Sequence, residues 1–185
     1  MCTHNHTYTY INACTFIKTH TYVYTCTHTH IYIYIYLVLA HITLVLIMQT
    51  TFRVRSRGAG TYEFTKDVTA WCAKSGVKVG LLTLFVQHTS CSLLISENAD
   101  PEVQVDMKNF MSRLVPPTTD PSMKYLTHTY EGPDDMPGHI KNALLPVSIS
   151  IPVTNGRPCL GTWQGIFLFE HRDQSHERKI VAHLA

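Results

Sequence analysis

The sequence predicts an α+β domain that follows an N-terminal extension of different composition. From Gln49 onward, short apolar or alternating segments typical of strands outnumber the segments with helical spacing. Turn residues separate these segments, as at Gly58, Gly60 and the pair Asn155-Gly156. The segment from Gln49 to the end of the 185-residue chain is also long enough for one domain with a hydrophobic core.

The first part of the domain is predicted to contain two strands and a helix. Residues 51–55 alternate with period two, and residues 61–64 follow a glycine-rich turn, so both segments are expected to be strands. Residues 65–73 carry apolar side chains on one helical face. Thr65 is the expected N-cap of this helix, and Gly76 is expected to end it.

A polar run then separates two apolar stretches. Residues 80–87 and 93–95 are predicted to be buried strands, and His88-Thr89-Ser90-Cys91-Ser92 lies between them. Unpaired polar groups in such a place cost about 1–3 kcal/mol each, so this run must be hydrogen-bonded or functional.

A helix is predicted from Asp100, since the sequence Asp-Pro-Glu places an N-cap acid before a proline in the first turn. Its expected buried face consists of Val103, Met107, Phe110, Met111 and Leu114. The paired prolines at 116 and 117 should end it.

The following loop, residues 115–136, is long for a compact domain, and loops of this length are usually functional or disordered. It holds His128, Glu131, Asp134 and Asp135, which favours function.

The last part of the domain is predicted to be mostly strand. A short helix is expected at residues 137–145 and a strand at residues 147–153. The Asn155-Gly156 pair predicts a hairpin turn, with residues 160–170 as the returning strand. Residues 177–184 are expected to form an edge strand.

Residues 1–47 form a low-complexity extension built mainly from Thr, His, Tyr, Ile and Cys, in which Lys18 is the only Lys, Arg, Asp or Glu. Its His-Thr and Tyr-Ile pairs resemble translated dinucleotide repeats. We therefore expect a gene-model artefact or an acquired, disordered extension, with Met48 as the working start. Two alternatives are a membrane anchor at residues 31–48 and a metal-binding histidine tract.

Composition narrows the class of protein. The formal net charge of +2 does not indicate the excess of basic residues that is typical of nucleic-acid-binding proteins, so no nucleic acid is expected as a partner. Cys72, Cys91 and Cys159 show no C-x-x-C or zinc-finger spacing, and they are expected to be reduced thiols of a cytoplasmic protein. No membrane partner is expected unless residues 31–48 are expressed and insert.

Three histidines of the domain stand at segment ends or in loops with acids nearby: His88, His128 and His139. One such histidine alone is more often structural than functional. Three together favour a site. Three imidazoles suit zinc or a similar metal, and they also suit proton transfer or phosphate binding near neutral pH.

Other polar side chains have both functional and structural interpretations. Glu97 ends a strand, and Asp106 lies in the first turns of a helix, where a solvated position is the alternative. Gln164 is either a site residue or a core amide that holds a loop. Glu170 and Arg178 lie in the last two predicted strands, where they could form a pair between adjacent strands or a surface ion pair.

Ser90 and Cys91 are weak candidates for a nucleophile. Ser90 lacks the flanking glycines of the G-x-S-x-G turn, and the surroundings of Cys91 match no thiol-enzyme signature. Lining or structural roles are therefore expected for both.

Four blocks resemble the YjbQ-like family, also called the secondary thiamine-phosphate synthase family. They are GLLTLFVQHTSCSLLISENADPEV, HTYEGPDDMPGHIKNALL, SISIPVTNGRPCLGTWQGIFLFEHRD and RKIV. The resemblance covers residues 49–184 and implies a β-sandwich of about seven strands with two or three short helices. It also implies a homotrimer and weak synthesis of thiamine phosphate from hydroxymethylpyrimidine diphosphate and thiazole phosphate, with release of diphosphate.

The polar residues that fall on the family's motif are His88, Ser90, Glu97, Asp106, His128, His139, Gln164, Glu170 and Arg178. We expect catalytic roles for His88, Glu97, Asp106 and His139. We expect contacts to a small phosphorylated molecule from Ser90, Gln164, Glu170 and Arg178. A divalent metal, zinc or magnesium, would be held by His88, His128 and His139. The alternative is a non-catalytic trimer that binds a metal or a small ligand.

Overall fold

The computed structural model describes residues 48–185. The predictions for the extension, including the disordered segment, the histidine tract and the membrane anchor at residues 31–48, lie outside the described residues, apart from Met48. Within residues 48–185, no helix is long and apolar enough to cross a membrane. The α+β fold class is confirmed, because the described residues form eight strands in two sheets, three α-helices and one 3₁₀ turn.

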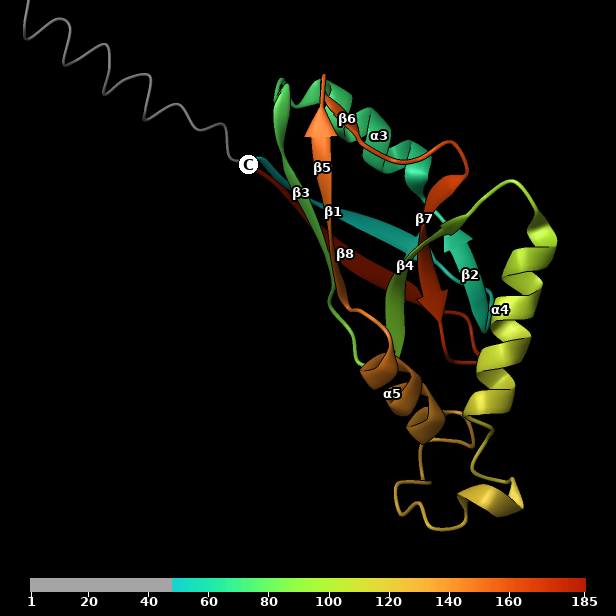
Figure 1. Cartoon of the computed structure of the whole chain (residues 1–185). Coiled ribbons are helices and arrows are strands. Elements are labelled where there is room, and N and C mark those ends of the chain that lie inside the picture. Colours follow the sequence, from blue (N-terminus) through green and yellow to red (C-terminus); the bar gives the residue numbers. More distant parts are fainter. Residues whose placement is uncertain (1–47) are drawn as a thin grey trace, which may run out of the picture. The chain divides into compact units, whose positions relative to one another are not determined.

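The larger sheet has five antiparallel strands and contains both ends of the domain (Figure 1). Its strands, in spatial order, are β1 (Met48–Arg55), β8 (Glu177–Leu184), β3 (Val79–Val86), β5 (Ser148–Thr154) and β6 (Arg157–Pro158). On β3, Leu82, Leu84 and Val86 are fully buried, whereas alternate residues such as Leu81 and Phe85 are exposed. This period of two directs one face of the sheet into the core.

The smaller sheet has three antiparallel strands, in the order β2 (Gly60–Glu63), β7 (Gln164–Glu170) and β4 (Cys91–Glu97). Leu93, Ile166 and Leu168 from this sheet join Leu82 and Ile180 from the larger sheet in one buried cluster. The two sheets therefore pack as a sandwich around a shared hydrophobic core.

The helices are α3 (Thr65–Lys74), α4 (Pro101–Leu114) and α5 (Asp135–Leu144), with the 3₁₀ turn η2 at Pro121–Met123. The Asp100 carboxylate accepts a hydrogen bond of 2.8 Å from the Glu102 backbone N–H, as an N-cap does. The predicted apolar face of α4 is only partly covered, because Met111 is buried while Phe110 and Leu114 are exposed.

Two predictions about strand neighbours are wrong. The Asn155-Gly156 turn has both residues at positive φ, as predicted, but the returning strand is only Arg157–Pro158. Residues 164–170 instead pair with β2 and β4 in the smaller sheet. The strand at residues 177–184 is not an edge strand, because β8 lies between β1 and β3. Apolar patterning indicates that a segment is a strand but not which strands it pairs with.

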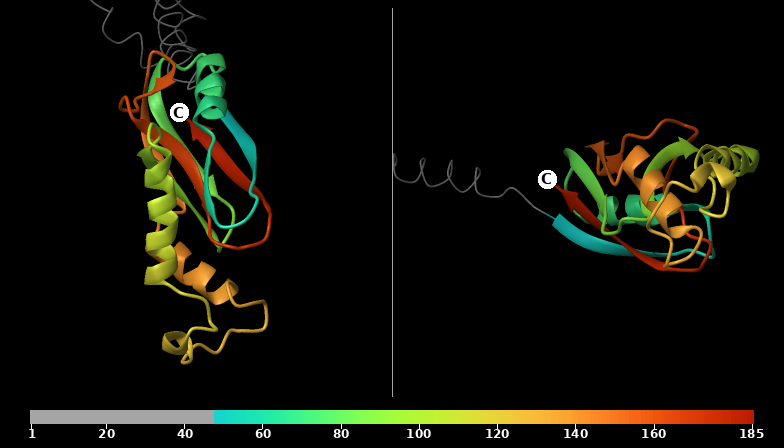
Figure 2. Two further views of the ribbon diagram at one scale, coloured as in Figure 1. Left: turned by 90° about the vertical axis from the view of Figure 1, so that its right-hand side faces the viewer. Right: turned by 90° about the horizontal axis from the view of Figure 1, so that it is seen from below.

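One end of the domain gathers the polar segments. The loop between α4 and α5 extends beyond the sheets there, in the lower part of Figure 1 and in the left view of Figure 2. The β3–β4 turn meets α5 through a hydrogen bond of 3.0 Å between the Thr89 carbonyl and His139 Nδ1. The same turn meets the β7–β8 connection, where the His171 backbone N–H donates to the Ser90 carbonyl.

Candidate functional site

A buried ion pair between Glu170 and Arg178 lies at the centre of this end of the domain. Arg178 Nε donates to Glu170 Oε2 at 2.7 Å, and Arg178 Nη2 donates to Oε1 at 2.6 Å. Both side chains are almost fully buried. The pair joins β7 of the smaller sheet to β8 of the larger sheet. It is therefore neither a pair between adjacent strands nor a surface ion pair.

Further donors complete the shell around the Glu170 carboxylate. The Ser56 hydroxyl donates to Oε2 at 3.0 Å, and the backbone N–H groups of His171 and Arg172 donate to Oε1 at 3.1 Å. Burial alone would raise the pKa of Glu170. The hydrogen bonds and the charge of Arg178 outweigh burial and hold this pKa below its usual value, so the carboxylate is ionised.

A polar chain runs from the ion pair to the surface through Ser90 and His88. Arg178 Nη2 donates to Ser90 Oγ at 3.2 Å, and His88 Nδ1 lies 3.2 Å from both the backbone nitrogen and the hydroxyl of Ser90. Because Nδ1 accepts the backbone hydrogen bond, the ring proton of neutral His88 lies on Nε2. Partial burial and the charge of Arg178 lower the pKa of His88, which favours this neutral form.

The neighbouring thiol is unsuited to nucleophilic attack. Burial raises the pKa of Cys91 to about 12, so the thiol stays protonated near neutral pH. The expectation of a lining or structural role for Cys91 therefore agrees with its surroundings.

A second cluster consists of His128, Asp135 and His139. His128 Nε2 lies 2.8 Å from Asp135 Oδ2, and His139 Nε2 lies 3.4 Å from the same oxygen. The three atoms that could ligate a metal, one from each residue, lie within 4.8 Å of one another. Two imidazoles and one carboxylate at this spacing form a ligand set that zinc uses in proteins, with a position left open for another ligand.

Hydrogen bonding at His139 shows that the cluster needs a positive charge. The Thr89 carbonyl can only accept, so His139 Nδ1 carries the ring proton. In a neutral ring, Nε2 then presents a lone pair to the Asp135 carboxylate, and two acceptors face each other. Only a second ring proton or a bound cation makes this contact favourable.

Arg172 holds the carboxylates of this region in place. Its guanidinium forms an ion pair with Asp135 Oδ1, donates to Asp134 Oδ2 at 3.0 Å and donates to the Glu131 carbonyl at 2.9 Å. Arg172 thus engages Asp135 Oδ1, and the other carboxylate oxygen, Oδ2, lies toward His128 and His139. An outer-shell partner of this kind orients a metal ligand.

Comparison with known proteins gives the family. The family model described as UPF0047 protein YjbQ-like matches residues 50–185. The chain belongs to this family. UPF0047 protein sll1880 of Synechocystis is 46% identical over 132 residues, which cover 71% of this chain and 87% of the relative. UPF0047 protein YjbQ of Escherichia coli O157:H7 is 42% identical over 137 residues, covering 74% and 96%.

Solved structures of similar proteins share the fold. The hypothetical protein APE1520 from Aeropyrum pernix aligns with a TM-score of 0.66 at 27% identity, covering 75% of this chain and 98% of that chain. The conserved hypothetical protein TT1486 from Thermus thermophilus aligns with a TM-score of 0.63 at 30% identity, covering 74% and 99%. The resemblance to the YjbQ-like family and the expected α+β sandwich are confirmed.

The YjbQ-like domain brings together six of the nine residues on the family's motif. They are His88, Ser90, Glu170 and Arg178 in the polar chain, and His128 and His139 in the second cluster. The predicted metal ligands were His88, His128 and His139. Within residues 48–185, the side chains that lie close enough to share a metal ion are His128, His139 and Asp135, so Asp135 takes the place of His88.

Three of the predicted site residues lie elsewhere in this chain. Glu97 and Gln164 are register partners at the opposite end of β4 and β7, and both are exposed. Asp106 is exposed on α4. Proximity in the sequence to the His88 run suggested Glu97, but a seven-residue strand separates the two ends.

Asp135 and Arg172 are site residues that sequence reasoning did not assign. Asp135 was noted only as an acid of the long loop, whereas it is the first residue of α5. Its spacing of four residues from His139 places the two side chains on one helical face, and this signal was available in the sequence. Nothing in the sequence indicated that Arg172 would face Asp135 from a distant connection.

Replacing Arg178 with Met should strongly destabilise the domain, because it leaves the buried Glu170 carboxylate without its cation. We expect the free energy of unfolding to fall by about 3–5 kcal/mol. The control is Arg53→Met, which removes an exposed arginine 2.7 Å from Glu177 and should cost at most about 1 kcal/mol. Urea unfolding followed by circular dichroism measures both. Equal, small losses would show that the buried pair contributes no more than a surface pair.

Proposed function

We propose that this YjbQ-like domain holds a divalent metal ion on His128, Asp135 and His139. The observation that carries the proposal is the contact between His139 Nε2 and the Asp135 carboxylate, two acceptors that a bound cation would make compatible. Zinc suits two imidazoles and one carboxylate better than magnesium, which prefers oxygen ligands and bound water.

The surroundings support a metal at this position. The Thr89 carbonyl fixes the ring of His139, and Arg172 fixes the carboxylate of Asp135. A bound zinc ion would polarise a phosphate oxygen and neutralise negative charge that develops there. His88 lies on the same β3–β4 turn as Thr89 and exposes its ring at this end of the domain. This position supports a contact between His88 and a small molecule held at the metal.

For the reaction, we propose weak thiamine-phosphate synthesis as a secondary activity. The thiazole nitrogen would attack the methylene carbon of hydroxymethylpyrimidine diphosphate, and the carbon–oxygen bond would break as diphosphate leaves with the electron pair. The support is family membership together with the metal-ligand cluster and the hydrogen-bonded turn that carries His88.

A specific observation favours the alternative of a non-catalytic binding protein. At this end of the described domain, the guanidinium groups of Arg172 and Arg178 are both engaged by carboxylates. Neither is free to hold a diphosphate, whose departure needs positive charge. Turnover by the metal-bound protein would favour the enzyme, and bound metal without turnover would favour the binding protein.

We also propose that the domain forms a homotrimer, as the family resemblance implies. On the outer face of β3, at the centre of the larger sheet, Val79, Leu81 and Phe85 are 76%, 48% and 45% exposed. Apolar side chains grouped on the central strand of a sheet are typical of a surface that another protein covers. A second copy of the chain is the proposed occupant of this outer face.

Zinc content tests the metal site. The purified full chain should contain about one zinc per chain by elemental analysis after dialysis, in line with one three-ligand cluster. In Asp135→Asn, zinc affinity should fall by more than the roughly 10- to 100-fold that loss of an outer-shell partner costs. His183→Ala, on β8, is the matched control and should keep the metal. Equal zinc in both variants, or none in the unaltered protein, would contradict the site.

Growth of a thiamine-phosphate-synthase-deficient strain tests the reaction. The unaltered chain should restore slow growth without thiamine, His88→Ala should not, and His183→Ala should behave like the unaltered chain. Immunoblots establish that all three are present in equal amounts. Unimpaired growth with His88→Ala would end the catalytic assignment of His88. No growth with a zinc-loaded, unaltered chain would favour the binding protein.

Sedimentation velocity of the full chain tests the trimer. Phe85→Glu places a charge on the outer face of β3 and should convert trimer to monomer, since an unpaired interface charge is costly. Tyr125→Glu is the control, because Tyr125 is also exposed, at 72%, but lies in the loop before α5. A monomeric unaltered chain, or a trimer that survives Phe85→Glu, would contradict the proposed contact.

A further inference from the structure

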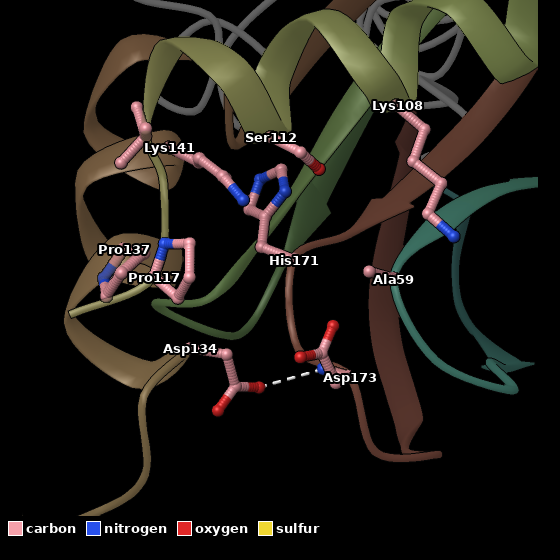
Figure 3. Close-up of a pocket in the computed structure, with 10 residues that line it drawn as sticks. Ala59, Lys108, Ser112, Pro117, Asp134, Pro137, Lys141, His171 and Asp173 are labelled. Atoms are coloured by element: carbon pink, nitrogen blue, oxygen red, sulfur yellow. Dashed lines mark hydrogen bonds between the residues drawn. The ribbon is translucent and has the colours of Figure 1, made fainter. Parts of the chain in front are cut away.

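A small cavity lies beside α5 and is distinct from the metal-ligand cluster. Its volume is about 170 Å³, and Lys141, His171, Ser112, Lys108, Asp134 and Asp173 contribute its polar lining (Figure 3). Drug-sized ligands occupy cavities of about 300 Å³ or more, so this one suits a single small group.

The cavity and the metal cluster use two faces of the same helix. Asp135 and His139 are four residues apart and share one face of α5. Pro137 and Lys141 are also four residues apart, on the roughly opposite face of the helix, and they line the cavity. A ligand in the cavity would therefore not need to touch the proposed metal.

His171 lines this cavity and carries a buried ring nitrogen without a partner among residues 48–185. The side chain is only 2% exposed, and its Nε2 lies 2.9 Å from the buried Ser92 hydroxyl. Its Nδ1 is buried and has no hydrogen-bond partner in the part of the chain that the structure describes. A buried polar atom without a partner is costly, and in a natural protein it calls for a physical explanation such as a missing ligand.

The protonation of His171 follows from its surroundings. Burial, together with the charge of Lys141, lowers the pKa of His171 to about 4, so the ring is neutral near pH 7 and carries one proton. If the Ser92 hydroxyl donates to Nε2, only the Nδ1 proton is left unpaired within residues 48–185, whereas the reverse direction leaves both the hydroxyl proton and Nδ1 unpaired. Hydrogen-bond matching thus favours Ser92 as the donor. The ring proton therefore lies on Nδ1, which is a donor in need of an acceptor.

Lys141 supplies a second set of donors. Its side chain is half-buried and forms no hydrogen bond or ion pair within the described residues. Figure 3 shows Lys141, Ser112 and His171 gathered along one side of the cavity, with Asp134 and Asp173 at the other. Asp134 Oδ2 already accepts hydrogen bonds from Arg172 Nε and the Asp173 backbone N–H. The hydrogen-bond donors of Lys141 and His171 therefore lie on the same side of the cavity.

We propose that this cavity is an oxyanion subsite that takes a phosphate group, with Lys141 Nζ and His171 Nδ1 as its donors. A phosphate oxygen offers the acceptor that the buried N–H lacks, and a lysine ammonium binds phosphate as a point charge. The subsite goes beyond the proposed metal function and does not depend on it.

Titration of the full chain with inorganic phosphate tests the subsite. At constant ionic strength, calorimetry should show saturable binding, and histidine-selective ¹⁵N spectra should show a shift of the His171 Nδ1 signal. Lys141→Met keeps the length of the side chain but removes a charge-assisted hydrogen bond, so affinity should fall about 10- to 100-fold. The charge-matched control is Lys66→Met on the exposed surface of α3, which should bind phosphate like the unaltered chain.

A chelator distinguishes this subsite from the metal cluster. Phosphate binding should persist after chelator treatment of the full chain. Binding that disappears with the chelator would place the phosphate on the metal and overturn the subsite. Equal affinity in Lys141→Met and Lys66→Met, an unmoved His171 signal or an absence of saturable binding would also overturn it.

Discussion

The buried ion pair between Glu170 and Arg178 positions the other polar groups at this end of the domain. It ties the smaller sheet to the larger one, and its carboxylate also accepts the backbone N–H groups of His171 and Arg172. Through its guanidinium it reaches Ser90 and so holds the turn that carries His88. Burying two charges is costly, and complete hydrogen bonding offsets the cost only in one geometry. That requirement gives the surrounding loops a single arrangement.

The same pair determines where the two proposed sites lie. Because Glu170 fixes the start of the β7–β8 connection, Arg172 is directed at Asp134 and Asp135, and His171 is directed at the cavity beside α5. The helix α5 then separates the two functions, with the metal-ligand face on one side and Lys141 on the other.

The sequence predicted local structure well and long-range neighbours poorly. The apolar stretch at β3 and the acid before Pro101 identified a strand and a helix start, because these signals depend on residues close in the chain. The run at residues 165–170 is buried on both faces, so its pattern suited a hairpin partner as well as a central strand. Glu97 was placed near His88 by proximity in the sequence, although the length of β4 carries it away. Asp135 could have been found from its spacing to His139, whereas Arg172 could not.

Hydrogen-bond matching separates structural polar residues from those that face a ligand. Ser90 and Glu170 lie in the core with their donors and acceptors matched, so their polarity is fully used by the fold. Two ring nitrogens at this end are not matched within residues 48–185. His139 Nε2 faces a carboxylate with a lone pair, and His171 Nδ1 carries a buried proton with no acceptor. A cation would relieve the first mismatch and an anion the second, so the two proposed ligands have opposite charge and lie on opposite faces of one helix.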